Sequence, residues 1–282
     1  TTEIYTLSLH DALPIYDNNF TFLGYRAYDF VAGQGGDQRP IASVVAESGL
    51  GLLREASFLV FDEFRDQAPL PPAVMAFVSR PDLLMVTKSN RRSPVHRSVH
   101  MDVIVVKRTD ASGQVLGEHM FVGLFTAVAY NLSARSIPLL RRKLNNVISR
   151  AGFDPREHDG RALINIIESY PRDELFQISE DHLLNTALGV LDLQQRRRVR
   201  LFLRRDDFER FVSCMVYLPI ERYTTNRRLA VQSILAKAFN GTISAHYSQV
   251  GDAPLARLQI VVRTTPGKIP EYNVDELEAA IV

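Results

Sequence analysis

The order of strand and helix patterns between Arg172 and Arg263 constrains the fold of this chain more than any other feature. Apolar residues recur there at alternate positions in some stretches and at three- or four-residue spacing in others, which predicts strands and helices respectively. The predicted strands are residues 174–178, 199–204, 211–218, 242–247 and 256–263, and the predicted helices are 179–195 and 225–239. A helix pair on one face of an antiparallel sheet is the ferredoxin-like βαββαβ plan, which we predict for residues 172–266.

The preceding part of the chain is mostly strand. Residues 99–108 and 115–130 predict a long hairpin across the turn 110–113. Further strands are expected at 20–30, 58–64 and 83–87, and a short helix at 72–79. High sheet content with few helices favours a PAS-like, mostly antiparallel sheet domain over residues 16–131.

Between these two regions, residues 132–171 predict a helical connector. One apolar stripe ends at Gly152, and a second runs through Leu163 and Ile167 before Pro171 ends it. The fold class predicted for the whole chain is therefore α+β, with a sheet domain, a helical connector and a second sheet domain.

Both ends of the chain differ from the rest. Residues 1–15 include TLSLHDALPI, which resembles a translated sequencing adapter, so we expect a non-native segment that packs on nothing, with native sequence from about Tyr16. Residues 267–282 predict a linker and the start of a truncated helix, because an acidic start and apolar spacing meet no stop signal.

Composition excludes several classes of protein. The chain has 282 residues, 46% hydrophobic, with 33 basic and 32 acidic side chains and a net charge of +1, so it has no general attraction to nucleic acid or anionic lipid. Cys214 is the single cysteine, which excludes an internal disulfide and suits a reducing compartment. No apolar run approaches the roughly 20 residues that cross a bilayer. We expect a cytoplasmic protein without a membrane partner.

Residues that could carry chemistry are in unsuitable contexts, so we predict no catalytic, cofactor-binding or metal-binding residue. The glycines of 33–36 lie in a polar loop with no helix pattern behind them, unlike a dinucleotide turn. His96 and His100 are four residues apart in extended sequence, where about 13 Å separates them. His119 is expected to be a cross-strand partner, and Cys214 an inert core thiol.

One charge feature stands out, the basic run before and within the strand at 199–204. Interleaved with Phe202 and Phe208, it is the basis of an alternative function, RNA binding or an autonomous protein-interaction module. Neighbouring acidic residues can neutralise it, so a solvated or subunit-facing charged interface is the favoured interpretation and nucleic acid is not an expected partner. The candidate interface comprises Arg196, Arg197, Arg198, Arg200, Arg204 and Arg205.

Several separate segments carry a family resemblance. Residues 91–130, 137–152, 170–177 (YPRDELFQ) and 198–219 (RVRLFLRRDDFERFVSCMVYLP) resemble the amino-terminal half of the large bacterial NAD-dependent glutamate dehydrogenases. The resemblance implies ACT-like and PAS-like regulatory domains, and a parent enzyme that uses NAD to oxidise L-glutamate to 2-oxoglutarate and ammonia. It implies an inactive fragment without the catalytic core or any cofactor of its own, whose partners are other domains of the same polypeptide and identical subunits.

The resemblance also suggests an effector site. ACT domains commonly bind amino acids where the first strand turns into the first helix, because free amides there hold a carboxylate. In this chain the corresponding residues are Ile178, Ser179 and Glu180, with Ser179 as the expected N-cap. The turn lacks the usual glycine, and Glu180 would repel an anion. We therefore expect subunit contact and coupling as the chief role and an amino-acid effector second.

Overall fold

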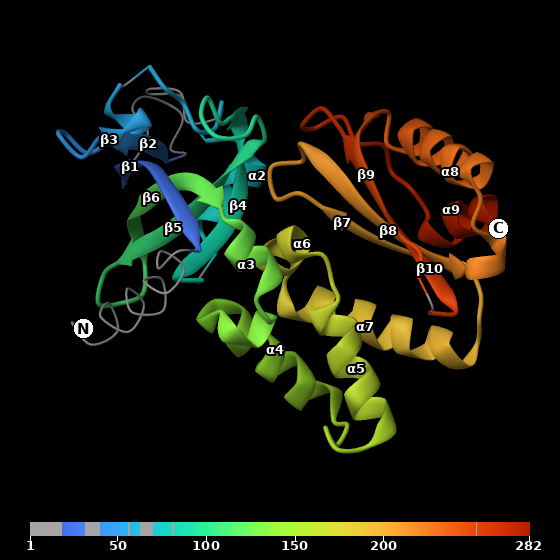
Figure 1. Ribbon diagram of the computed structural model, residues 1–282. Coiled ribbons are helices and arrows are strands. Elements are labelled where there is room, and N and C mark those ends of the chain that lie inside the picture. Colours follow the sequence, from blue (N-terminus) through green and yellow to red (C-terminus); the bar gives the residue numbers. More distant parts are fainter. Residues whose placement is uncertain (1–18, 32–39, 56, 63–69, 81, 252) are drawn as a thin grey trace. The chain divides into compact units, whose positions relative to one another are not determined.

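The computed structural model describes residues 19–31, 40–55, 57–62, 70–80, 82–251 and 253–282 (Figure 1). They form two compact units. Unit 1 comprises the chain up to residue 146 together with residues 170–177, and unit 2 comprises residues 147–169 and 178–282. The expectations for residues 1–15 and for the glycines at 33–36 lie outside the described residues.

Unit 1 is built on an antiparallel sheet of six strands in the order β2-β1-β6-β5-β4, with β3 paired to β1. Their bounds are β1 Phe20–Val31, β2 Ile41–Val44, β3 Leu50–Gly51, β4 Leu84–Arg92, β5 His100–Thr109 and β6 Val115–Phe125. The predicted hairpin is confirmed as β5 and β6, whose turn is held by Asp110 Oδ1 accepting from the amides of Ser112 and Gln114. Residues 58–62 are irregular where a strand was expected, although Val60 and Phe61 are buried.

The two faces of this sheet carry different side chains. Along β5, Val103, Val105 and Lys107 point to one face and alternate with Asp102 and Ile104 on the other. Helix α2 (Pro72–Val78), predicted at 72–79, covers the first face, where Lys107 reaches its C-terminal carbonyls. Helix α6 (Arg172–Gln177) lies against the second, where Asp173 meets Lys88. We call these the α2 face and the α6 face.

The predicted helices of the connector are present. They are α4 Pro138–Ala151 and α5 His158–Glu168, preceded by α3 Ala127–Asn131 and the 3-10 turns η1 Leu52–Arg54 and η2 Ala134–Ser136. Gly152 adopts φ 75°, a left-handed conformation that ends α4 as expected. Helix α7 (Glu180–Gln195) begins at the predicted cap, since Ser179 Oγ accepts a hydrogen bond from the amide of His182.

The predicted strand at 174–178 is wrong, because these residues form α6. Pro171 precedes the helix and accepts the bond from the Leu175 amide, while Asp173 and Glu174 occupy the first turn, where acidic residues favour a helix. Glu174, Leu175 and Phe176 are buried in succession, which a strand with one covered face would not allow.

Unit 2 contains an antiparallel sheet of four strands in the order β7-β8-β10-β9. The elements are β7 Arg200–Arg205, β8 Phe211–Pro219, η3 Ile220–Arg222, α8 Thr225–Ala238, β9 Thr242–Gln249, β10 Leu255–Arg263 and α9 Val274–Ile281. The strands β7 to β10 and the helix α8 lie within one or two residues of the bounds predicted from the sequence. Helices α8 and α9 contact each other on one face over a core that includes Leu235, Ile260 and Ile281 (Figure 1). On the other face, Gly189 of α7 meets the ring of Phe202.

The sheet of unit 2 is a permuted version of the predicted plan. A βαββαβ unit places its first strand centrally, whereas here β10, the last strand, takes the central position and α9 follows it. The predicted truncated helix start is thus part of the core. Asn273 caps α9, Ile281 is 5% exposed, and Glu278 accepts bonds from Arg200 and from the Leu201 amide. The observed class is α+β with antiparallel sheets.

Candidate functional site

The most connected polar site lies on the α6 face of unit 1 and begins with Lys88 and Asp102. These residues are directly opposite each other on β4 and β5, with Nζ and Oδ1 2.5 Å apart. Asp102 is 2% exposed, and its other oxygen accepts a bond of 2.8 Å from the Phe125 amide. A buried carboxylate with two donors is compensated for its lost hydration.

The pair is ionic. Burial lowers the pKa of Lys88, but Asp102 and Asp173 outweigh this and raise it above its ordinary value. Burial raises the pKa of Asp102, and Lys88 opposes that shift. The 2.5 Å contact and the Phe125 amide both favour the carboxylate form, so we assign Asp102 as ionised.

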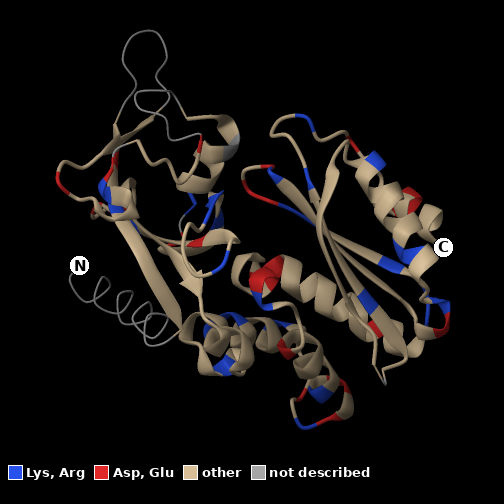
Figure 2. Ribbon diagram, turned by 45° about the horizontal axis from the view of Figure 1, so that its top comes forward, with Lys and Arg blue, Asp and Glu red and all other residues tan. Residues whose placement is uncertain are grey.

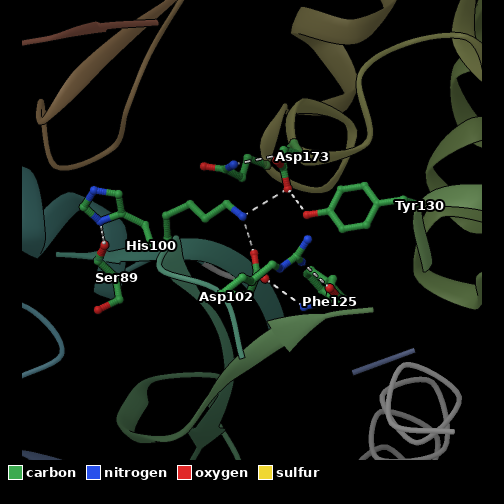
Figure 3. A network of polar contacts seen from close by, with 9 residues as sticks. Ser89, His100, Asp102, Phe125, Tyr130 and Asp173 are labelled. Carbon is green, nitrogen blue, oxygen red and sulfur yellow. Dashed lines mark hydrogen bonds and ion pairs between the residues drawn. The ribbon is translucent and has the colours of Figure 1, made fainter. Parts of the chain in front are cut away.

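Helix α6 joins this pair through Asp173 (Figure 3). Its Oδ1 accepts bonds from Lys88 Nζ at 3.0 Å and from the Tyr130 hydroxyl, on α3, at 2.6 Å. Burial raises the pKa of Tyr130, and the neighbouring Asp173 adds to this effect, so the hydroxyl keeps its proton and acts as donor. One ammonium and one phenol therefore hold the first turn of α6.

The rest of α6 is also fixed within unit 1. Phe176 stacks on Phe125 with ring centroids 4.3 Å apart and 2° between planes. Lys143 Nζ, on α4, donates to the carbonyls of Leu175 at 2.9 Å and Phe176 at 3.2 Å, where a cation complements the helix C-terminus. Leu175 is fully buried. Both ends and one side of this six-residue helix are thus held.

The position of α6 along the chain gives these contacts a further consequence. Residues 147–169 and 178–282 belong to unit 2, yet the residues between them belong to unit 1. The chain thus leaves unit 2, passes through α6 and returns. We call Lys88, Asp102, Tyr130, Asp173 and Phe176 the coupling site, because they hold α6, which is joined along the chain to segments of unit 2 on both sides.

The predicted effector residues do not form the expected turn. Ile178 is 1% exposed between two helices, and the Ser179 side chain caps α7. The acidic first turn is partly balanced by Arg150, whose nitrogens lie 3.9 Å from Glu180 and 2.5 Å from Asp181. No strand precedes α7, so the strand-to-helix geometry behind the prediction is absent from this described segment.

The basic run is dispersed among acidic partners. Arg198 pairs with Asp192 at 3.2 Å, Arg200 with Glu278 at 3.3 Å and Arg205 with Glu209 at 2.7 Å. Arg204 lies over the ring of Phe211, and Arg196 and Arg197 are exposed beyond α7. Figure 2 shows basic and acidic positions interspersed along the described elements.

The aromatic residues of the basic run have partners or are buried within unit 2. Phe208 is 1% exposed, and Phe202 packs edge-on against Tyr217. A single-strand binding face needs exposed rings beside its cations. These positions therefore favour the charged-interface interpretation over RNA binding.

The remaining candidate residues make hydrogen bonds within the fold or are buried in a core. His100 Nδ1 lies 3.0 Å from the Ser89 carbonyl, and the described residues contain no group of three side chains suited to a metal. His119 is hydrogen-bonded across the sheet to the Tyr25 hydroxyl at 2.8 Å. Cys214 is buried in the core of unit 2. No helix among the described residues has the length and apolar content to span a bilayer.

Sequence reasoning missed the coupling site. Asp173 lies 85 residues from Lys88 and 43 from Tyr130, so no local spacing links them. The available signal was a lone lysine inside the apolar strand LLMVTKSN, which requires a buried counter-charge if that strand is covered.

Comparisons with known proteins give consistent results. Residues 137–196 match the family model described as glutamate dehydrogenase, helical motif 1, and residues 200–282 match glutamate dehydrogenase, ACT2 domain. Over 270 residues the chain is 39% identical to the NAD-specific glutamate dehydrogenase of Halomonas elongata, covering 95% of this chain and 16% of that protein.

Two further relatives carry the same name. The chain is 33% identical to the NAD-specific glutamate dehydrogenase of Pseudomonas aeruginosa over 268 residues, covering 95% of this chain and 16% of the relative. It is 33% identical over 267 residues to that of Mycobacterium tuberculosis, covering 92% of this chain and 14% of the relative. The chain therefore spans a small part of the length of these proteins.

Proposed function

Because the chain belongs to the family of NAD-specific glutamate dehydrogenases, we propose that it is a regulatory and assembly portion of such an enzyme. The whole enzyme would convert L-glutamate, NAD and water to 2-oxoglutarate, ammonia and NADH. NAD would be bound, and the reaction carried out, on polypeptide outside this chain. The isolated chain should be inactive.

The coupling site is the observation that carries this proposal. Hydride transfer needs a site that holds a dinucleotide against a substrate, whereas the coupling site uses its charged groups to fix one short helix. A helix held by one unit and continuous with segments of another is suited to transmit strain between them. Its partners would be other domains of the polypeptide and identical subunits.

The domain division remains a prediction. We propose that residues 16–131 form a PAS-like domain and that 132–171 connect it to an ACT-like domain. The match of the ACT2 model to 200–282 supports an ACT-like domain from β7 to α9, in place of 172–266 with a separate tail. A cytoplasmic location remains a prediction from the single cysteine.

A chimera tests the proposed role. The stretch of the Halomonas elongata relative that matches this chain would be replaced by the chain itself, and glutamate-dependent NADH formation should persist. Asp173→Asn in the chimera should reduce the fraction of assembled oligomer in mass photometry and leave the KM values for glutamate and NAD unchanged. A matched control is Asp62→Asn, since Asp62 is 46% exposed against 44% for Asp173 and pairs with Arg91.

Two results would contradict the proposal. The first is turnover of glutamate and NAD by the purified 282-residue chain. The second is a rise in the KM for glutamate in the Asp173→Asn chimera with assembly intact, because it would place substrate contacts near α6. Either result would assign the chain to the catalytic part.

Effector binding is a second candidate function, favoured by a groove of about 800 Å³ within unit 2. Its lining includes Asn165, Gln194, Tyr217 and Arg257. Arg257 Nη1 donates to the Ser169 carbonyl at 2.6 Å, which holds the guanidinium at the groove. A guanidinium flanked by amides suits a carboxylate ligand such as an amino acid.

Titration calorimetry with a panel of amino acids tests this second candidate. Saturable heat that Arg257→Gln abolishes and Arg263→Gln leaves intact would place the effector in the groove. Heat abolished by Ser179→Ala would restore the site predicted at Ile178, Ser179 and Glu180. Absence of saturable heat with every amino acid would remove amino-acid sensing by this chain.

A further inference from the structure

A row of titratable side chains crosses the α2 face of the unit 1 sheet. Tyr28 on β1, Glu118 on β6 and Lys107 on β5 are direct neighbours in register, Tyr28 opposite Glu118 and Lys107 opposite Glu118. None of the three is more than 1% exposed. The coupling site is on the other face, so this row is separate from it.

Lys107 directs all of its donors to the end of α2. Its Nζ donates to the carbonyls of Phe77 at 2.9 Å, Val78 at 2.6 Å and Arg80 at 2.8 Å. An ammonium has three protons, so these bonds use all of them. The carbonyls at a helix C-terminus carry partial negative charge and favour the cation. Lys107 therefore fastens the C-terminus of α2 to the sheet.

Glu118 has no comparable support. The residue is 0% exposed, and neither carboxyl oxygen has a hydrogen-bond partner among the described residues. A buried carboxylate without donors is strongly disfavoured, whereas a neutral carboxylic acid is tolerated. Burial raises the pKa of Glu118 to about 7, and the Lys107 ammonium partly opposes this shift.

We propose that Glu118 is a proton-binding site that controls how firmly α2 is held on the sheet. When Glu118 carries a proton, Lys107 remains on the α2 carbonyls. When the proton leaves to solvent, the new carboxylate competes for the ammonium of its direct neighbour. Lys107 then moves towards Glu118, and the last turn of α2 is released.

The other titratable groups described around Glu118 are held by other partners or stay neutral. On β1, Arg26 donates to the backbone carbonyls of Leu53, Glu55 and Phe58, which hold its guanidinium. Tyr28 has a raised pKa, mainly from burial, and stays neutral. Burial lowers the pKa of Lys107 to about 8, Glu118 opposes that shift, and Arg80 and Asp82 act in opposite directions. The helix α2 contains no titratable side chain. Lys107 is therefore the described cation placed to respond.

Hydrogen exchange of α2 tests the proposal on the full chain. The readout is the protection of the Met75, Ser79 and Arg80 amides, corrected for the intrinsic pH dependence of exchange. Between pH 5 and 7, below the range in which Lys107 itself loses its proton, the neutral fraction of a group titrating near 7 falls about twofold, so protection should fall about twofold. Glu118→Gln, which stays neutral, should show protection independent of pH over this range. Glu55→Gln, at an exposed glutamate, should behave as wild type.

A second measurement decides the matter if Glu118→Gln fails to fold. Glutamate-selective carboxyl ¹³C labelling of the wild-type chain should reveal one resonance that titrates near neutral pH. The proposal is overturned if every glutamate titrates near its ordinary value. It is equally overturned if α2 protection falls with pH to the same extent in wild type and Glu118→Gln.

Discussion

Two lysine–carboxylate pairs, each with a buried carboxyl group, lie on opposite faces of the unit 1 sheet, and β5 contributes one residue to each. Lys88 and Asp102 are neighbours on the α6 face, and Lys107 and Glu118 are neighbours on the α2 face. Each pair joins adjacent antiparallel strands at a directly opposite position. The backbone geometry that presents the charges is therefore nearly the same in both.

The pairs differ in where the remaining hydrogen bonds go. Asp102 accepts from Lys88 and from the Phe125 amide, while Lys88 also reaches Asp173. Lys107 gives its protons to α2, and Glu118 receives none. A lysine–carboxylate pair is fixed when every donor and acceptor is matched, whereas a buried carboxylate that lacks donors responds to protons. The comparison thus separates a structural site from a titrating one.

The largest expected effect comes from breaking the matched pair. Lys88→Met leaves Asp102 buried without a cation, which should cost about 3–5 kcal/mol of the free energy of unfolding of unit 1. Exchange of β5 amides under denaturant reports that free energy separately from unit 2. Adding Asp102→Asn removes the stranded charge and should recover most of the loss. A loss below about 1 kcal/mol in Lys88→Met would show that the pair is not ionic.

The second prediction concerns the pH dependence of stability. Glu118 has a folded-state pKa raised from 4.5 to about 7, so the folded chain binds the extra proton between these values. Stability should therefore fall as pH rises from about 4.5 to about 7 and then level, a total of about 3 kcal/mol. Glu118→Gln should remove this slope from urea midpoints measured between pH 5 and 8. Parallel profiles for the two proteins would contradict the raised pKa.

Much of the fold could be predicted because its signals are local. The hairpin of β5 and β6, the stop at Gly152 and the cap at Ser179 each depend on a few adjacent residues. Helix α6 could not, because six residues with three consecutive buried positions do not distinguish a helical from a strand periodicity. The permuted order of the sheet in unit 2 was missed for the same reason, since the first strand of the predicted plan was placed at residues 174–178, most of which form α6.

The two lysine–carboxylate pairs required information that no local pattern holds. Glu118 lies on the same face of β6 as the buried residues Met120 and Val122, so its burial could have been inferred from the strand pattern. That Lys107 would serve α2 instead of Glu118 depends on residues 27 to 30 positions away. Asp173 reaches Lys88 only because residues 172–177 form a helix, whereas we predicted a strand at 174–178.

The third prediction compares the two lysines directly. Lys107→Met removes three bonds to the end of α2, but Glu118 can remain a neutral acid, so no charge is stranded. The loss should be about 1–3 kcal/mol, smaller than for Lys88→Met, and concentrated in α2 amides. Hydrogen exchange of α2 and β5 peptides at pH 6 measures the size of the loss and shows whether it is concentrated in α2. A loss as large as that of Lys88→Met would mean that Glu118 is ionised in the folded chain at that pH.

The smallest expected effect concerns the Tyr130 hydroxyl in the coupling site. Tyr130→Phe removes the hydroxyl that donates to Asp173 at 2.6 Å but keeps the ring, over which the Arg97 guanidinium lies at 5.7 Å. The loss should be about 1 kcal/mol, confined to the α6 amides, because Lys88 still holds Asp173. Tyr25→Phe is the matched control, since that hydroxyl bonds His119 on the same face away from α6. Equal loss of α6 protection in both variants would mean that the hydroxyl of Tyr130 does not anchor the helix, and that Lys88 and the Phe125–Phe176 stack hold α6 without it.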